Sequence, residues 1–153
     1  MRVDFYQLSR DPAPLAVAQI AAKAVEAGKR LLIVADEDAL LIKVSEALWG
    51  RPGTFLANGA AGGPHDARQP ILLSDKVDAA NGATCLILAD GKWREGVAPD
   101  CGGAECGEFE RIFLFFDDTT VVAARDLWKA LGNREDLTRN FWKQDGGKWV
   151  QAA

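Results

Sequence analysis

The sequence lacks the residue combinations on which most catalytic and cofactor-binding sites depend. It contains a single histidine, His65, which cannot be paired from the sequence with any obvious nucleophile. The turn after the first expected strand, residues 9–14, contains no glycine. Neither the dinucleotide fingerprint nor a phosphate-binding loop of the Walker type is therefore present. We expect no catalytic residues and no cofactor.

Cysteine is also scarce, and its three positions do not form a recognisable site. An odd number of cysteines argues against a disulfide framework. Cys101 and Cys106 have a spacing that zinc sites allow, but a tetrahedral site needs four ligands and the chain has one histidine. We interpret Cys85 as a core residue and the other two as structural or incidental, and we expect no bound metal.

The chain has no apolar run that approaches the length of a membrane span, and residues 1–10 carry polar and acidic side chains where a signal peptide would be apolar. We therefore expect a cytoplasmic protein that does not bind membranes. The net charge of −4 argues against direct nucleic-acid binding. The six Lys/Arg and four Asp/Glu of residues 121–153 make the C-terminal part slightly basic, which suits an acidic ligand.

Strand-like and helix-like segments alternate along the rest of the chain. Residues 30–35 and 84–89 are nearly unbroken apolar runs, as expected for strands that are covered on both faces. The pattern predicts strands at 2–8, 30–35, 71–73, 84–89 and 111–116, helices at 12–27, 39–49, 75–80 and 121–132, and a Gly-rich loop at 58–69. This alternation indicates an α/β fold, doubly wound, with a mostly parallel central sheet flanked by helices. We expect residues 1–153 to form one domain.

The end of the chain, residues 137–151, is predicted to form a hairpin around an Asp-Gly-Gly tripeptide. A loop made of the two glycines pairs Asp145 with Lys148. A loop that begins one residue earlier pairs Trp142 with Trp149. The sequence does not decide between these two registers.

The helix expected at 121–132 is amphipathic and carries a tryptophan at the border of its apolar side. Its core-facing residues are Val121, Ala124, Leu127, Trp128 and Leu131. Next to Trp128 on the wheel lie Arg125 and Lys129, with Val122 behind them. An aromatic ring beside two cations suits an acidic peptide that ends in an apolar group. The alternative is a buried tryptophan with solvated cations whose stems lie over it.

The helix expected at 39–49 has two large apolar residues on the side that should face water. Ile42 and Trp49 are seven residues apart, and Arg51, Pro52 and Phe55 continue this surface into the following loop. Exposed apolar groups that stack in this way indicate an interface with a partner. The alternative is that Trp49 folds back under the loop as a small satellite core.

Acidic residues follow two of the expected strands. They are Asp36, Glu37 and Asp38 after the second strand and Asp117 and Asp118 after the last central one. If the strands are parallel, these acids could meet at one edge of the sheet and hold a magnesium ion for phosphotransfer or phosphate hydrolysis. The alternative is that both groups cap the helices that follow them.

Several segments together resemble the family of the chi subunit of bacterial DNA polymerase III holoenzyme, an accessory protein of the clamp loader. They are VDFYQL, GKRLLIVADEDALLIKVSEALW, RPGTF, ARDLWKAL and FWKQDGGKWVQ, in this order along the chain. The resemblance implies a Rossmann-like α/β fold without catalytic activity. It also implies a bridge between the clamp loader and the single-stranded-DNA-binding protein, whose C-terminal tail is acidic and ends in Pro-Phe.

The resemblance further implies where two partners bind. The family holds the acidic tail with an arginine, an aromatic residue and a lysine, which correspond here to Arg125, Trp128 and Lys129. We add Val122 and the hairpin residue Trp142 as apolar contacts for the terminal phenylalanine. The family binds its psi partner, another clamp-loader subunit, through the surface that corresponds here to Trp49, Arg51, Pro52 and Phe55. We add Ile42 from the exposed side of the same helix.

Overall fold

The computed structural model describes residues 2–9, 11–51, 56–78, 80–93, 109–132, 137–145 and 148–152. Within these residues, eight strands form one sheet in the order β3-β4-β2-β5-β6-β1-β7-β8. The strands are β1 (Arg2–Gln7), β2 (Leu31–Val34), β3 (Asn58–Ala60), β4 (Ile71–Ser74), β5 (Cys85–Leu88), β6 (Arg111–Phe116), β7 (Thr138–Asp145) and β8 (Lys148–Gln151). All neighbouring strands pair in parallel except β7 and β8, which are antiparallel.

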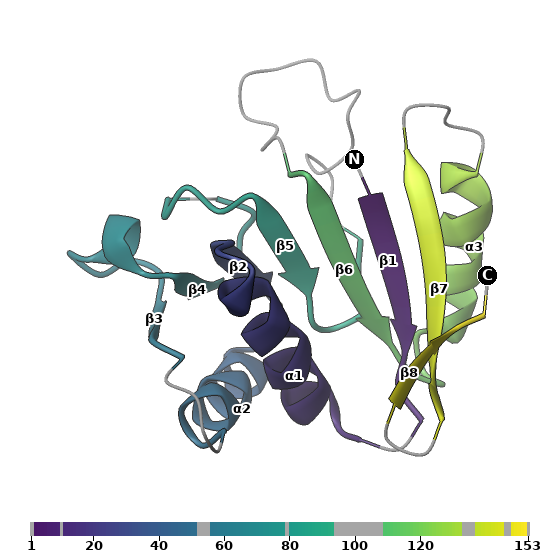
Figure 1. The fold of residues 1–153 in the computed structure, drawn as a ribbon, viewed down its shortest axis with the longest axis horizontal. Coiled ribbons are helices and arrows are strands. Elements are labelled where there is room, and N and C mark those ends of the chain that lie inside the picture. The colour runs from purple at the N-terminus through teal and green to yellow at the C-terminus, as the bar shows by residue number, and fades with distance from the viewer. Residues whose placement is uncertain are drawn as a thin grey trace.

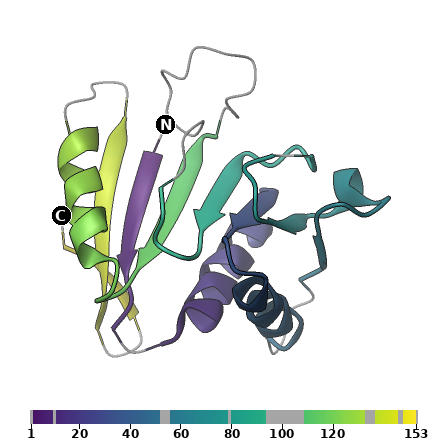
Figure 2. The same ribbon diagram turned by 180° about the vertical axis from the view of Figure 1, so that it is seen from behind.

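Helices cover both faces of this sheet. Figures 1 and 2 show α1 (Ala13–Glu26) and α2 (Asp38–Trp49) on one face and α3 (Val121–Leu131) on the other. Alternate residues of each central strand point to opposite sides, so that Ile33 packs with α1 and α2 whereas Leu32 belongs to the core that includes α3. Leu32 and Ile33 are both fully buried. The expected doubly wound α/β fold with a mostly parallel sheet is confirmed.

Helix α1 ends in the way that the sequence predicts. The backbone N–H of Gly28 donates to the carbonyl of Val25, and that of Lys29 donates to the carbonyl of Ala24. Gly28 has a φ of 79°, a conformation that glycine adopts without the steric cost of a Cβ. This pair of bonds stops the helix and turns the chain into β2.

Three local predictions are wrong. The segment expected to be a loop contains strand β3 and the 3₁₀ turn η1 (Asp66–Arg68). The described part of the short helix predicted at 75–80 is not helical, because Lys76 donates its N–H to the Ser74 hydroxyl and the backbone follows a local turn. Helix α3 begins at Val121 as expected, but its N-cap is Thr120 and not Asp117 or Asp118.

Strand β3 shows why the loop prediction failed. Its sequence, Asn-Gly-Ala, has little intrinsic tendency to form a strand. The Asn58 side chain is nearly buried, accepts a hydrogen bond of 2.6 Å from the Ser45 hydroxyl and donates to the Leu56 carbonyl. Gly59 leaves room for the Gln69 side chain, which would lie within 2.8 Å of a Cβ at that position. Tertiary contacts, not local propensity, therefore stabilise this strand.

The hairpin register is the one that pairs Asp145 with Lys148, so Trp142 lies opposite Gln151 and not opposite Trp149. The parallel pairing of β7 with β1 attaches this hairpin to the edge of the sheet next to α3. Among the described residues, no helix is both long enough and apolar enough to cross a membrane.

Candidate functional site

Helix α3 buries the side that its sequence pattern predicts. Ala124 and Leu131 are buried, and Val121, Leu127 and Trp128 are partly buried against the same core. Arg125 and Lys129 are exposed. Trp128 therefore lies at the border between core and solvent, with two cations beside it on the outer side of the helix.

The environment of the Trp128 ring is largely aromatic. The ring meets Phe5 of β1 edge-to-face, with centroids 5.2 Å apart, and meets Phe141 of β7 in the same way at 6.0 Å. The guanidinium of Arg139 lies 4.2 Å from the centroid of the Trp128 ring and also donates a hydrogen bond to the Trp128 carbonyl. These contacts orient the indole through ring packing and a cation–π interaction.

A hollow of about 340 Å³ opens between α3 and the strands beneath it, and we call it the α3 groove. Its apolar surface comes mainly from Phe5, Phe116, Trp128 and Phe141. Its cations are Arg125 and Lys129 on the helix and Lys143 on β7, and the remaining lining residues are Gln7, Val121 and Ala124. The groove thus has an aromatic floor with cations on two opposite sides, and none of its described lining residues is a carboxylate.

The structure brings together three of the five residues that we expected to bind the tail. Arg125, Trp128 and Lys129 all line the α3 groove. Val122 is 69% exposed and lies outside the lining, one position after Val121. It remains a prediction that Val122 adds an apolar contact at the outer rim.

The assignment of Trp142 to this site is wrong. Trp142 points to the other face of the sheet, where its ring stacks on Tyr6 with centroids 6.1 Å apart and its indole N–H donates to Asp4 at 3.0 Å. Because side chains alternate along a strand, its neighbours Phe141 and Lys143 point into the α3 groove instead.

Sequence reasoning missed Phe5, Phe141, Lys143 and Arg139. The last three are spaced two residues apart in β7, which marks them as one face of a strand. That signal could have grouped them. It could not have shown that this face, and not the face with Trp142, meets α3, because both faces carry an aromatic ring.

The α2 surface also agrees in part with the expectation. Ile42 is 53% exposed and Trp49 is 50% exposed, so the outer side of α2 carries two large apolar groups. Trp49 is not sealed into a satellite core. Arg51 is half-buried. Pro52 and Phe55 lie outside the described residues.

Four of the five acids that could have formed a magnesium site are divided between two cavities, and Asp118 lines neither of them. Asp36 and Asp38 line a cavity beside α2, whereas Glu37 and Asp117 line another at the carboxyl ends of the strands. Asp36 forms an ion pair of 2.9 Å with Lys92. In the part of the chain that the structure describes, no three histidine, cysteine or acidic side chains are close enough to share a metal ion.

Asp117 has a local structural role. Its carboxylate accepts hydrogen bonds from the backbone N–H and the hydroxyl of Thr119, at 2.9 and 2.6 Å. These bonds, the side-chain bond first, lower the pKa of Asp117 below its ordinary value. Asp117 therefore orders the turn before α3, three residues before the N-cap Thr120, and does not itself cap the helix as we expected.

Comparison with known proteins identifies the family of the chain. A family model described as DNA polymerase III chi subunit, HolC, matches residues 1–138. The match includes helices α1–α3 and strands β1–β6 and ends at the first residue of β7, so Phe141 and Lys143 lie beyond it. No curated protein matches the chain. The matched family is that of a non-catalytic accessory subunit of the replicative polymerase, and the chain belongs to this chi subunit family.

Proposed function

We propose that the α3 groove binds the acidic C-terminal tail of the single-stranded-DNA-binding protein, and that the chain thereby links this protein to the clamp loader. The observation that supports this proposal is the combination of an aromatic floor with cations on two sides. A phenyl ring at the end of a peptide can be buried on such a floor while the carboxylates next to it face the cations. We further propose that residues 1–153 act as one domain, in the cytoplasm.

The floor of the groove suits a terminal aromatic residue. Phe5 and Phe141 contact the Trp128 ring in edge-to-face pairs, and Arg139 covers one face of this ring. An aromatic ring from a ligand can then pack in an offset or edge-to-face arrangement without moving the floor. Burial of one such ring contributes roughly 1.5–3 kcal/mol.

The rim of the groove suits acidic residues. Arg125 and Lys129 are four residues apart, on successive turns of one side of α3, and Lys143 is exposed on the opposite side. An acidic peptide that lies along the groove therefore meets cations on both sides. Exposed ion pairs contribute about 0–1 kcal/mol each, so one buried ring and three such pairs supply at most about 6 kcal/mol, which corresponds to a dissociation constant of tens of micromolar or weaker.

Titration of the protein with a peptide that ends in Asp-Asp-Ile-Pro-Phe tests this proposal. We expect Lys129→Glu to weaken binding at least about tenfold, because it removes one attraction and adds a repulsion at the rim. Lys143→Gln should weaken binding about twofold to fivefold, the loss of one exposed pair. The same peptide without its terminal phenylalanine should bind far more weakly.

Lys76→Glu is the matched control, since Lys76 is exposed on a turn outside the α3 groove and the substitution changes the net charge equally. Its affinity for the peptide should equal that of the wild type. Calorimetry gives the dissociation constants. A wild-type protein that does not bind the peptide, or a Lys129→Glu variant that binds it normally, would contradict the proposed site.

We propose that the outer side of α2, marked by Ile42 and Trp49, contacts a psi-like or other clamp-loader subunit, with Arg51, Pro52 and Phe55 continuing this surface. The two exposed apolar side chains on one helix support this assignment. Their position on the α1/α2 face of the sheet leaves the α3 groove available for the tail. One chain could then hold both partners at once.

Ile42→Glu tests the partner surface with little risk to the fold, because the side chain is 53% exposed. We expect this variant to lose its clamp-loader partner in gel filtration while it keeps its affinity for the tail peptide. Leu15→Glu on α1 is the control, since Leu15 is equally apolar and 55% exposed. Loss of the partner by both variants, or by neither, would contradict a specific surface on α2.

A further inference from the structure

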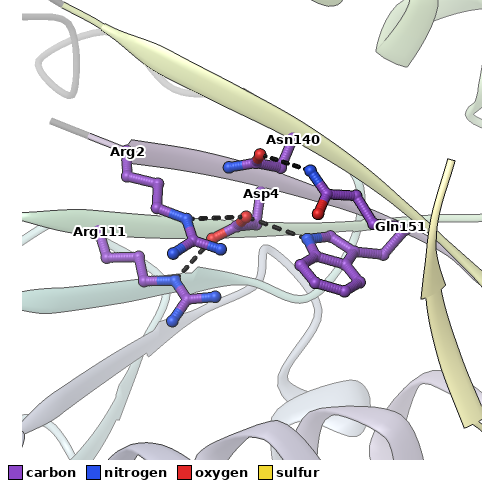
Figure 3. A network of polar contacts seen from close by, with 6 residues as sticks. Arg2, Asp4, Arg111, Asn140 and Gln151 are labelled. Atoms are coloured by element: carbon purple, nitrogen blue, oxygen red, sulfur yellow. Dashed lines mark hydrogen bonds and ion pairs between the residues drawn. The ribbon is translucent and has the colours of Figure 1, made fainter. Parts of the chain in front are cut away.

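A second basic hollow lies on the opposite face of the sheet, and its arginines are held by a buried carboxylate. Asp4 on β1 is fully buried. It accepts hydrogen bonds from Arg2 Nε at 3.2 Å, from Arg111 Nε at 2.6 Å and from the indole N–H of Trp142 at 3.0 Å. Figure 3 shows the Arg2 and Arg111 side chains running side by side toward Asp4.

This arrangement fixes two guanidinium groups and leaves most of their donors unused by Asp4. Each arginine contributes one N–H to the carboxylate, while a guanidinium carries five. Arg111 also lies over the Phe113 ring, 4.4 Å from its centroid. The side chains of Arg2 and Arg111 are 42% and 33% exposed, so their outer ends reach a space that a ligand can enter.

That space is a cavity of about 310 Å³ between the C-terminal half of α1 and the amino ends of β1, β5 and β6, and we call it the α1 cavity. Its aromatic lining residues are Tyr6 and Phe113, each 3% exposed. On the helix side, Ala24 and Ala27 fill little volume, which leaves the cavity open. Lys29 and Glu110 also line it and form an ion pair of 2.6 Å.

The charge around the α1 cavity is positive although the whole chain is acidic. Among the described residues, four cations, namely Arg2, Lys23, Lys29 and Arg111, stand against two carboxylates, Glu110 in the lining and Asp4 behind it, which leaves a balance of +2. The net charge of the chain is −4. One arginine is enough to neutralise Asp4, so among the described residues one guanidinium charge is left without a carboxylate of its own.

We propose that the α1 cavity is a binding site for a small aromatic anion, a carboxylate or a phosphate monoester. The two oriented guanidinium groups would bind the anionic group through paired hydrogen bonds, and Tyr6 and Phe113 would pack against the aromatic ring. A volume of about 310 Å³ is at the small end of ligand sites, which span roughly 300–1,000 Å³. It suits a ligand with one ring better than a dinucleotide.

Titration of the full chain with phenyl phosphate, benzoate and inorganic phosphate tests this proposal. The indole N–H resonance of Trp142, assigned with Trp142→Phe, reports on the site because this N–H shares Asp4 with both arginines. We expect saturable shifts with a dissociation constant of about 1 mM or below for phenyl phosphate or benzoate. The tighter of the two identifies the anionic group. Inorganic phosphate should bind more weakly because it cannot pack on the rings.

Two variants test separately how the charge and the volume of the α1 cavity contribute to binding. Arg2→Gln removes one of the two guanidinium groups, and Ala24→Leu fills the α1 cavity from the helix without changing any charge. Each should weaken binding about tenfold, in the first case through lost charge-assisted hydrogen bonds. The controls Arg68→Gln and Ala123→Leu change exposed residues elsewhere and should bind as the wild type does.

The absence of a saturable shift in the wild type would overturn the proposal, as would an Ala24→Leu variant with unchanged affinity. Equal losses in Arg2→Gln and Arg68→Gln would show unspecific attraction to positive charge and would also overturn it. If inorganic phosphate binds as tightly as phenyl phosphate, the proposed packing of the ligand ring against Tyr6 and Phe113 is refuted. Circular dichroism and an unchanged affinity for the tail peptide would show that each variant is folded.

Discussion

The α3 groove and the α1 cavity combine the same kinds of residue in different ways. Both pair aromatic walls with cations, and β1 contributes to both, through Phe5 on one face and Asp4 and Tyr6 on the other. In the α3 groove the cations are exposed on the rim. In the α1 cavity two of them are bonded to a buried carboxylate. The first arrangement attracts a flexible acidic chain, whereas the second orients donors toward a small ligand.

The difference shows what a buried counter-charge does for a binding site. Exposed lysines and arginines keep their hydration and lose side-chain entropy when they pair, so each contributes little. A guanidinium that is already bonded through Nε has less freedom left to lose when an anion arrives. A buried carboxylate is tolerated in such a site only if it is hydrogen-bonded. Asp4 meets this condition because it accepts three hydrogen bonds.

The largest effect should come from removal of the buried carboxylate. Asp4→Ala leaves the Trp142 N–H and two guanidinium groups without their common acceptor. We expect the free energy of unfolding to fall by about 3 kcal/mol, at the lower end of the range for a broken buried pair because both arginines can regain water. Denaturant unfolding measures this change. Asp126→Ala, at an exposed carboxylate on α3, should change stability by less than about 0.5 kcal/mol. Similar losses of stability in Asp4→Ala and Asp126→Ala would contradict the proposed difference between the buried and the exposed carboxylate.

The next effect concerns Tyr6, which is 3% exposed and is the one tyrosine of the chain. Burial, assisted by the nearby Asp4 charge, raises the pKa of Tyr6 to about 12. An unfolded tyrosine ionises near pH 10, so the stability that the neutral ring contributes is complete below pH 10 and is lost as the pH rises toward 12. The loss should reach roughly 3 kcal/mol.

The absorbance of tyrosinate during an alkaline titration follows this residue directly, because no other tyrosine contributes. We expect the absorbance to rise near pH 12 in the folded protein and near pH 10 in denaturant. Tyr6→Phe should abolish the signal and reduce the slope of stability against pH between pH 10 and 12. A folded protein whose tyrosinate appears near pH 10 would show that the α1 face is open to water at this residue.

The smallest of the three effects is the response of the two sites to salt. Between about 0.1 M and 1 M salt the screening length falls from about 10 Å to 3 Å. The affinity of the α3 groove for the tail peptide should fall about tenfold, since its three cations are exposed. The affinity of the α1 cavity for phenyl phosphate should fall less, about threefold, because partly buried charges are screened less. Equal losses at both sites, measured by calorimetry, would remove the distinction between them.

Much of the fold could be predicted from the sequence. The apolar runs that became β2 and β5 are continuous, which is typical of strands covered on both faces, and both are fully buried. The helical periodicity of residues 121–132 correctly predicted which side of α3 faces the core and which side is exposed. Strand β3 could not be predicted, because the side-chain hydrogen bonds of Asn58 stabilise it. The start of α3 at Val121 was predicted, but its N-cap was not, because the Asp117 carboxylate accepts hydrogen bonds from Thr119 in the turn before the helix.

The candidate site was predictable only where it lies on one element. Arg125, Trp128 and Lys129 are neighbours on a single helix, so their proximity follows from helical geometry. Trp142 was assigned to the wrong face because its strand carries aromatic residues on both sides. Arg139 was missed because its contact with Trp128 depends on how β7 packs against α3.

The sequence by itself determined the class of the fold, the positions of most of its elements and the two exposed groups of residues on α2 and α3. Those properties follow from local periodicity and from the residues that begin and end helices. Only the tertiary structure decided which face of β7 meets α3, and which donors reach Asp4. Arg111 and Trp142 are 107 and 138 residues from Asp4 in the chain, and parallel pairing on both sides of β1 brings them together. Alternation along a strand defines two faces, but only packing against helices determines what each face contacts.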